Sequence, residues 1–325
     1  MAKRSPWAGL LKLGVSLAAI GYVAWRLWDD RDALVEAWLA LDGLGWAMLA
    51  AAVLLVAPNV GLEAGKWRMM VKEIYPELGL GKAVRAVLAG MASGIFTPNR
   101  IGEYAGRVLY LEKGRRVEAI VATFVDRICQ MGVTLAAGCA AFGVVFQMDS
   151  ARLQHVISPE SDQFIFWISL ASLGVFLAFV IAPSFVSRLI PESWTRWDWL
   201  RQVKVEGARL RSTLLLRVFA LSALRYATFL SQYILLLLAM GMAISLGEAL
   251  VCCALVFLLK SVVPLPGIME LGVRETVALA VFGAFGFADA PAVQATFLLY
   301  LVNIVLPTLA GVWALQGIQA NGGGK

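Results

Sequence analysis

The chain has 325 residues, of which 60% are hydrophobic and 15% are charged, whereas soluble domains average about 45–50% and about 25%. The mean hydropathy is +0.77, and the apolar bias runs from end to end. This composition excludes disordered, collagen-like, coiled-coil and ordinary soluble proteins, and also a large soluble domain on a single anchor. It predicts one polytopic, all-helical membrane domain over residues 1–325. We attribute the formal net charge of +6 to cytoplasmic loops rich in Lys and Arg.

Six apolar segments are long enough to cross a membrane as helices, which takes about 20 residues. They cover residues 8–28, 44–65, 117–145, 164–187, 213–243 and 293–318. The first follows Met1-Ala2-Lys3-Arg4 but has no small-x-small cleavage site, so we expect a retained span rather than a signal peptide.

The loops between these segments differ in charge. Basic residues gather in 66–85, 112–116 and 188–217, whereas 29–43 is acidic and 146–163 holds one base. The positive-inside rule then places the basic loops and both termini in the cytoplasm, with Lys66 among the loop cations. Because 188–217 mixes tryptophans with bases, it predicts a cytoplasmic interfacial helix, or alternatively a docking surface.

Two further apolar segments are interrupted before they could cross. Residues 83–111 break at Thr97-Pro98-Asn99-Arg100 and lie between basic loops, which favours a re-entrant hairpin from the cytoplasm over two short surface helices. Residues 249–286 break at Val263-Pro264-Leu265-Pro266-Gly267 between loops without Lys or Arg, so this hairpin would enter from the opposite side. The predicted fold is thus about six transmembrane helices plus two oppositely oriented re-entrant hairpins.

This order suggests an inverted repeat over approximately 44–145 and 213–318, an arrangement typical of transporters with a site near the midplane. Each hairpin break is followed by Glu-x-x-x-Arg, at Glu103–Arg107 and at Glu270–Arg274. Glu and Arg at this spacing lie on one helical face and can pair. With Thr97 as a cap, each return helix would begin near the midplane and attract anions there. The alternative is that the pairs only neutralise each other and lock the hairpins.

Charges at membrane depth are costly and usually mark a pathway. The candidate substrate-binding residues are Arg100, Glu103, Arg107, Asp126, Arg127, Arg225, Lys260, Glu270, Arg274 and Glu275, and the hairpin-break residues are Thr97, Pro98, Gly102, Pro264, Pro266, Gly267 and Gly272. For Asp126 and Arg127 a purely structural role is an equal alternative. GxxxG pairs at Gly61–Gly65, Gly90–Gly94 and Gly102–Gly106 predict close helix packing.

Other chemistry finds little support in the sequence. A GxxxxGK[ST] motif is absent, and the single histidine, His155, lies in a polar loop. The four cysteines lie in apolar runs and are interpreted as small buried hydrophobes. We expect neither a metal site nor a cofactor, and we expect that the chain is not an enzyme.

The two break motifs resemble those of the lysylphosphatidylglycerol synthase/flippase transmembrane family, including its stand-alone flippase-like members. The resemblance covers about 8–318 and rests on Thr97-Pro98-x-x-x-Gly102-Glu103-x-x-x-Arg107 and on Pro266-Gly267 with Gly272-Val273-Arg274-Glu275. It implies movement of a charged lipid between leaflets, without the separate aminoacyl-transfer domain of two-domain relatives. The family often has glycines where this chain has Asn99-Arg100, so lysyl-lipid specificity does not follow.

The resulting hypothesis is a lipid translocase of the bacterial cytoplasmic membrane. It would move a phospholipid, an aminoacyl-phospholipid or a polyprenyl phosphate without ATP hydrolysis by this chain, and nucleic acid is not an expected partner. The alternative is a non-transporting membrane protein that docks a cytoplasmic glycosyltransferase or lipid-modifying enzyme. An intramembrane enzyme is a weaker third possibility, because the sequence offers no nucleophile–base set.

Overall fold

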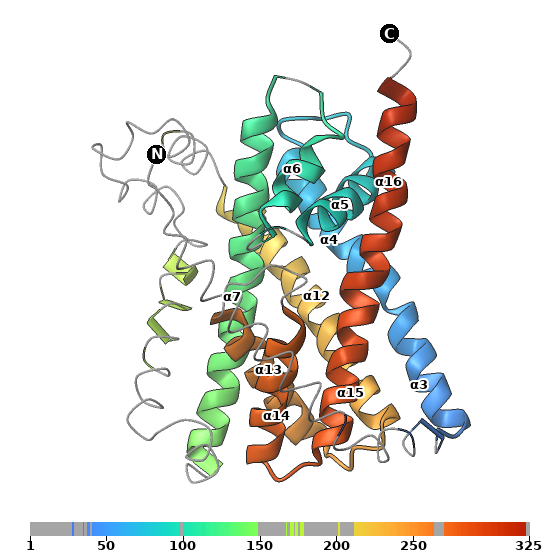
Figure 1. Ribbon diagram of the computed structural model, residues 1–325. Coiled ribbons are helices and arrows are strands. Elements are labelled where there is room, and N and C mark those ends of the chain that lie inside the picture. The colour runs from blue at the N-terminus through green and yellow to red at the C-terminus, as the bar shows by residue number, and fades with distance from the viewer. Residues whose placement is uncertain are drawn as a thin grey trace, which may run out of the picture.

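All regular secondary structure in the described part of the chain is helical, as a computed structural model shows (Figure 1). The structure describes residues 41–95, 97, 100–112, 114–148, 211–262 and 270–322, with single positions between 28 and 39, between 167 and 178, and at 201. Its helices are α3 (Gly43–Leu54), α4 (Val56–Val71), α5 (Leu80–Gly94), α6 (Gly102–Val108), α7 (Arg116–Met148), α12 (Ser212–Ala239), α13 (Leu246–Val262), α14 (Glu270–Ala284), α15 (Asp289–Tyr300), the π-helical η4 (Leu301–Val305) and α16 (Leu306–Gly322).

Four helical stretches are long and apolar enough to cross a membrane. They are Gly43–Val71, Arg116–Val145, Ser212–Ala239 and Asp289–Leu315. Within the most apolar window of each, only 22–44% of the residues are buried inside the protein, so much apolar surface faces outward, as lipid contact requires. The chain is therefore an integral membrane protein. The stretches match four of the predicted spans, whereas the predicted spans 8–28 and 164–187 lie largely outside the described residues.

Two of the four long helices are distorted shortly before a proline. Proline lacks an amide hydrogen, and its ring clashes with the carbonyl four residues earlier. Accordingly, α3 gives way to α4 at Leu55, three residues before Pro58. Likewise, α15 passes into α16 through η4, which ends two residues before Pro307 and contains Asn303. Single π-helical turns of this kind are frequent at functional sites.

Helices α5 and α6 form a hairpin whose backbones touch through glycines. A Cβ atom added to Gly90 would lie 2.8 Å from Arg107 Cγ, and one added to Gly106 would lie 2.7 Å from the Cα of Gly90. Gly94 and Gly102 are packed as closely against the facing arm. The predicted role of these two GxxxG pairs is thus confirmed, because only glycine allows this approach.

Two related predictions were wrong: close helix packing at Gly61–Gly65, and Thr97 as the N-cap residue of the return helix. An added Cβ at Gly61 or Gly65 meets no described atom within 4 Å, so this pair packs closely against none of the described helices. Helix α6 begins at Gly102 with Ile101 at its N-cap position and without a side-chain cap. The hydroxyl of Thr97 accepts a hydrogen bond from the Gly102 amide (2.8 Å), so it steadies the break from five residues away.

Helices α13 and α14 form the second hairpin. At the start of α13, the Ser245 amide donates to Glu248 Oε2 (3.2 Å) and the Ser245 hydroxyl accepts from the Glu248 amide (3.3 Å), which is a capping box. Residues 263–269, which include Pro264, Pro266 and Gly267, lie outside the described residues, as do Pro98 and most of the predicted interfacial helix 188–217. The last six residues of that predicted helix, 212–217, belong to α12 instead.

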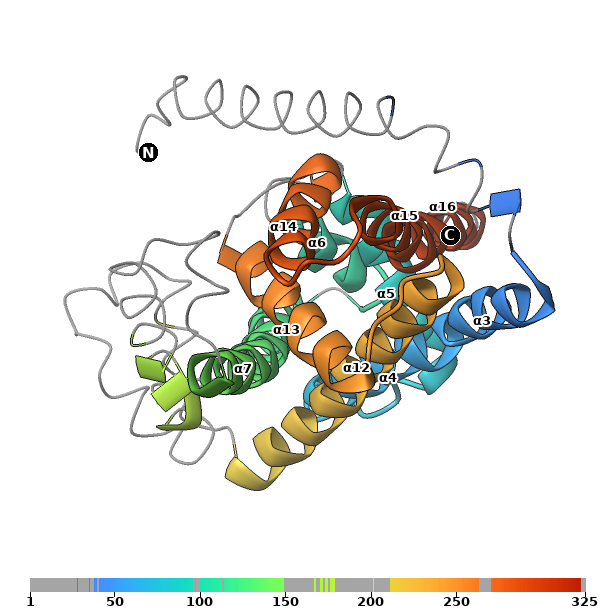
Figure 2. The ribbon, with the colours of Figure 1, turned by 90° about the horizontal axis from the view of Figure 1, so that it is seen from below.

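The two hairpins occupy opposite halves of the bundle. In Figure 1, α5 and α6 lie in the upper half and α13 and α14 in the lower half, while α7 and α12 pass through both. Helix α16 packs against α5, α13 against α7, and α14 against α15, an arrangement also visible from below (Figure 2).

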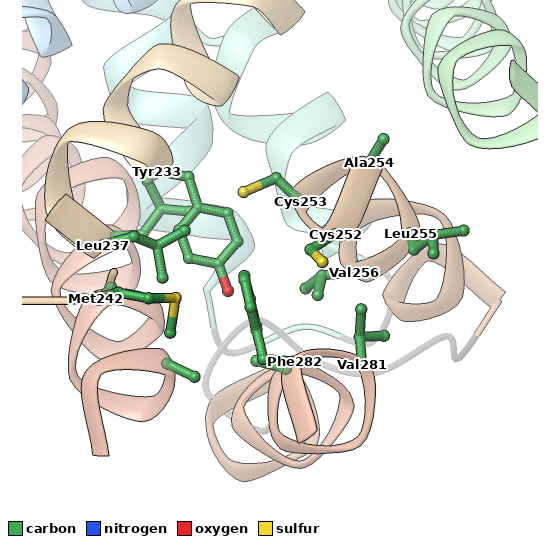
Figure 3. Packing of buried hydrophobic residues seen from close by; sticks show 14 of the residues in the cluster. Tyr233, Leu237, Met242, Cys252, Cys253, Ala254, Leu255, Val256, Val281 and Phe282 are labelled. Atoms are coloured by element: carbon green, nitrogen blue, oxygen red, sulfur yellow. The ribbon is translucent and has the colours of Figure 1, made fainter. Parts of the chain in front are cut away.

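Each hairpin belongs to its own apolar core. The core around α5 includes Trp67, Val87 and Leu215. The core around α13 and α14 includes Tyr233, Phe282 and the vicinal Cys252 and Cys253 (Figure 3). All four cysteines are free and buried, as predicted.

Helix α12 runs through both cores and reveals what separates them. Leu215 and Val218 belong to the α5 core, and Tyr233 and Leu236 to the other. Between these positions α12 buries the polar residues Ser222, Arg225 and Gln232. A polar layer therefore lies between two apolar cores.

Candidate functional site

The polar layer lies near the middle of the long helices. Arg225 is 13 residues after Ser212 and 14 before Ala239, the two ends of α12. At 1.5 Å per residue, this places Arg225 about 20 Å from either end. Helices α4, α6 and α7 contribute further buried charges to the same layer, so its energetics are those of charges held deep in a low-dielectric interior.

Glu63, on α4, is the centre of this layer. Its side chain is fully buried and contacts four cations. The contacting atoms are Arg107 Nη2 (2.5 Å), Lys66 Nζ (3.1 Å), Arg127 Nη2 (3.4 Å) and Arg225 Nε (3.4 Å). These cations come from α4, α6, α7 and α12, so one carboxylate links four helices.

Lys66 was predicted to lie in a cytoplasmic loop, and that prediction was wrong. Helix α4 continues to Val71, and the Lys66 side chain is completely buried. Its ammonium lies 3.2 Å from Asp126 Oδ1 and donates to Gln130 Oε1 at 3.0 Å. Counting the charges of a predicted loop cannot distinguish a solvated lysine from one that lies on the last turns of the preceding helix and points into the protein, as Lys66 does.

Glu103, on α6, joins the hairpin break to the layer. Its carboxylate lies 3.3 Å from Arg100 Nη1 and 3.6 Å from Arg107 Nη2, and it also accepts a hydrogen bond from Arg127. The predicted pair within α6 is therefore present but forms part of a larger network. Arg100 has a φ angle of +53°, the one non-glycine residue with positive φ in the described chain. Such backbone strain persists where the surroundings enforce it and clusters at functional sites.

The adjacent residues Asp126 and Arg127 have separate partners, as their spacing predicted. Asp126 lies between Lys66 and Arg107, the latter at 3.6 Å, whereas Arg127 contacts Glu63 and Glu103.

The network holds more positive than negative charge. It contains five cations, Lys66, Arg100, Arg107, Arg127 and Arg225, against three carboxylates, Glu63, Glu103 and Asp126. The formal excess is two positive charges. Among the described residues, an excess of cations at this depth is costly unless a further anion offsets it.

A cavity of about 200 Å³ opens beside the network, between the two hairpins. Its described lining includes five cationic residues, Arg100, Arg127, Arg225, Lys260 and Arg274, and no carboxylate. Tyr226, Phe229 and Phe257 form an aromatic part of the wall. The Arg225 guanidinium lies 4.9 Å from the centroid of the Phe229 ring, which is a cation–π contact.

Residues of the second hairpin reach the same cavity from the other half. Lys260 comes from the end of α13, and Arg274, from α14, lies over the ring of Tyr300 at 5.6 Å. Glu275 is buried beside the start of α14 and accepts a hydrogen bond from the Gly272 amide (2.6 Å). Gly272 has φ +90°, which favours glycine. The Glu270 side chain lies outside the described parts.

These contacts change the expected source of the positive potential. The first turn of α6 already holds Glu103, and a first-turn amide of α14 is bound by Glu275. At the start of α14, a carboxylate of the protein therefore occupies an amide that was predicted to attract an anion. At the start of α6, the Gly102 amide is bound by the Thr97 hydroxyl, and the acidic Glu103 follows it. The cavity owes its positive character to arginine and lysine side chains instead.

A group of neutral amides borders the charges. Asn59 donates to Asn303 Oδ1 (2.6 Å) and to Gln232 Oε1 (3.4 Å), and Gln232 donates to the Ala52 carbonyl (2.8 Å). Asn303, which lies in the π-helical turn, also lines the cavity.

Of the ten predicted substrate-binding residues, five line the cavity and three, Glu103, Arg107 and Asp126, lie in the adjoining network. Glu275 lies at the start of α14, and the tenth, Glu270, has no described side chain. Sequence analysis missed Glu63, Lys66, Gln130 and Asn303. The i,i+3 pair Glu63–Lys66 at the end of an apolar span was the available signal.

Within the described residues, no three His, Cys, Asp or Glu side chains are grouped as metal ligands. The acids of the polar layer are instead paired with cations.

Comparison with known proteins identifies the family of this chain. No curated protein sequence matches the chain significantly. The family described as lysylphosphatidylglycerol synthase TM region matches residues 9–311, nearly the whole chain, so this protein belongs to that family.

Proposed function

We propose that this protein is a translocase that carries an anionic, phosphate-bearing lipid between membrane leaflets. The observation that carries the proposal is the central cavity, with five cations and an aromatic wall between the two hairpins. The family description names a phospholipid synthase region, which supports a role with lipids.

The cavity chemistry suits a lipid phosphate. The main barrier to crossing is the transfer of a charged headgroup into hydrocarbon. Arginine forms strong charge-assisted hydrogen bonds with phosphate, and the guanidiniums of the cavity wall are already largely desolvated, since the side chains of Arg100 and Arg127 are only 24% and 27% exposed. At about 200 Å³ the cavity is smaller than typical pockets for drug-sized ligands, which start at about 300 Å³. It therefore suits a headgroup, while the hydrocarbon chains stay in the bilayer.

The proposed membrane arrangement has six spans, two re-entrant hairpins and inverted repeats over about 44–145 and 213–318. The opposite placement of the hairpins supports it (Figure 1). Rocking of one repeat against the other would expose the cavity to each leaflet in turn. We place both termini in the cytoplasm of a bacterial cell. Single cysteines introduced at positions 36 and 155 should react with an impermeant maleimide from outside, and those at 75 and 205 only from inside. External labelling at 205 would contradict the arrangement.

Transport would require no ATP hydrolysis by this chain, and we propose that it is not an enzyme. The test uses purified protein in liposomes, with dithionite quenching of acyl-labelled fluorescent lipids. The parent should accelerate exchange, whereas Arg127→Gln and Arg274→Gln, which remove cations from opposite halves of the cavity, should reduce it at least about tenfold. Arg217→Gln, an exposed change on α12, is the matched control. If no lipid in a panel of phospholipids and polyprenyl phosphates moves faster than in empty vesicles, the docking-protein alternative becomes the better explanation.

A further inference from the structure

We infer that the carried headgroup is a dianion, such as the terminal phosphomonoester of a lipid, and is neither zwitterionic nor cationic. This inference rests on the proposed function and adds the charge of its substrate.

The charge balance around the cavity is the first reason. The network and the cavity wall together contain seven cations: the five of the network, Lys260 and Arg274. The described carboxylates in this region are Glu63, Glu103, Asp126 and Glu275. Among the described side chains, cations therefore outnumber carboxylates by three, or by two if Glu270 is counted as a fifth carboxylate. A headgroup with two negative charges would balance the latter excess.

The distribution of these charges is the second reason. Glu63 and Asp126 are completely buried, and the Glu103 side chain is 2% exposed. In contrast, the side chains of Arg100 and Arg127 on the cavity wall are 24% and 27% exposed. An entering headgroup therefore meets cations first, and the carboxylates lie behind them. A lysyl headgroup, which carries two ammonium groups and one phosphate, would bring cations against this wall and be repelled.

Competition for Arg127 gives the dianion a way to enter. Arg127 is held by Glu103 and Glu63 in the structure, yet it also faces the cavity. A phosphomonoester presents three acceptor oxygens and up to two charges, so it can bind Arg127 in place of these carboxylates. A phosphodiester carries only one charge. The second charge of a phosphomonoester should allow at least one further charge-assisted hydrogen bond, which is worth roughly tenfold in affinity.

The test compares four acyl-labelled lipids in the same liposomes at pH 8: phosphatidic acid, phosphatidylglycerol, phosphatidylcholine and lysylphosphatidylglycerol. Phosphatidic acid should move about tenfold faster than phosphatidylglycerol, and the other two should not exceed the rate of empty vesicles. The second phosphate pKa is about 6, so the phosphatidic acid rate should fall from pH 8 to pH 5 relative to phosphatidylglycerol. Phosphatidylglycerol, a phosphodiester, keeps its single charge over this pH range, so a change in its own rate would report titration of the protein's carboxylates.

Variants connect the preference to the cavity. Lys260→Gln, which lies at the partly exposed end of α13, and Arg225→Gln should each lower the ratio of phosphatidic acid to phosphatidylglycerol rates. Arg225→Lys should retain more of it, and Arg217→Gln should leave it unchanged. Glycerol 3-phosphate trapped in the vesicles should stay inside. Its release through the parent would show that the phosphomonoester is a solute and would overturn the lipid assignment.

Failure of this inference is distinguishable from failure of the proposed function. Equal rates for all lipids, or faster lysylphosphatidylglycerol, would refute the dianion preference while transport stands. If no lipid moves, the proposed function fails. A binding measurement then tests separately whether the protein prefers a headgroup with two negative charges. Short-chain phosphatidic acid should then raise the melting temperature of the detergent-purified protein more than short-chain phosphatidylglycerol at equal concentration. Equal stabilisation would refute the inference.

Discussion

Replacement of Lys66 by methionine tests the central structural finding, the burial of this lysine between two carboxylates. In the structure its ammonium lies 3.1 Å from Glu63 and 3.2 Å from Asp126. Without it, Asp126 keeps Arg107 at 3.6 Å as its cationic contact among the described residues. Removal of one partner from a buried ion pair typically costs about 3–5 kcal/mol, so we expect Lys66→Met to lower the free energy of unfolding by about this amount.

The measurement is reversible unfolding in mixed micelles, followed by circular dichroism. Lys72→Met, an exposed change six residues later on the same segment, should alter stability by no more than about 0.5 kcal/mol. The double variant Lys66→Met/Asp126→Asn should cost about 1–3 kcal/mol less than the sum of its single changes, because residues in contact are coupled. A neutral Lys66→Met, or strictly additive effects, would refute the buried network and restore Lys66 to a solvated loop.

Two further changes test the hairpin and its break. Gly106→Ala should destabilise the protein by about 1–3 kcal/mol, because the new Cβ would lie 2.7 Å from Gly90 Cα. Gly65→Ala, whose added Cβ meets no described atom within 4 Å, should be neutral or stabilising in the same unfolding assay. Equal effects of the two changes would contradict the packing described. Arg100→Gly should relieve the backbone strain of the positive φ angle and remove a cation from the cavity wall. The melting temperature should therefore stay the same or rise, while the lipid preference in the liposome assay changes. An unchanged preference would show that Arg100 is not part of the site.

The sequence was informative where one helix alone decides the outcome. An apolar run of about 20 residues that crosses a membrane must do so as a helix, so four predicted spans match observed helical stretches with ends that differ by at most six residues. The helical pairs α5–α6 and α13–α14 could be predicted because Pro98, Pro264 and Pro266 interrupt apolar runs. Their re-entrant placement in the membrane stays a prediction.

The sequence was uninformative where partners come from different helices. Glu63 and Arg107 are 44 residues apart, and Asn59 and Asn303 are 244 apart. Hydropathy and loop charge carry no information on which helix faces which. The GxxxG pairs illustrate this, since the pattern at Gly61–Gly65 is the same as at Gly90–Gly94, yet of these two only Gly90–Gly94 packs closely against another described helix.

Glu63→Gln is the change that most directly joins the fold to the proposed site. The substitution keeps the size of the side chain but removes the charge around which Lys66, Arg107, Arg127 and Arg225 gather. The formal excess of the network would then rise from two to three positive charges, and stability in neutral detergent should fall by about 3–5 kcal/mol.

If the layer is built to receive an anionic headgroup, short-chain phosphatidic acid should restore part of this loss, because a ligand at 100 times its dissociation constant stabilises the folded state by about 2.7 kcal/mol. Phosphatidylcholine of the same chain length should restore none, and Glu73→Gln, an exposed change on the following loop, should show neither loss nor rescue. A Glu63→Gln variant that is as stable as the parent, or that gains equally from both lipids, would mean that the buried charges only hold the helices together and do not serve an anionic substrate.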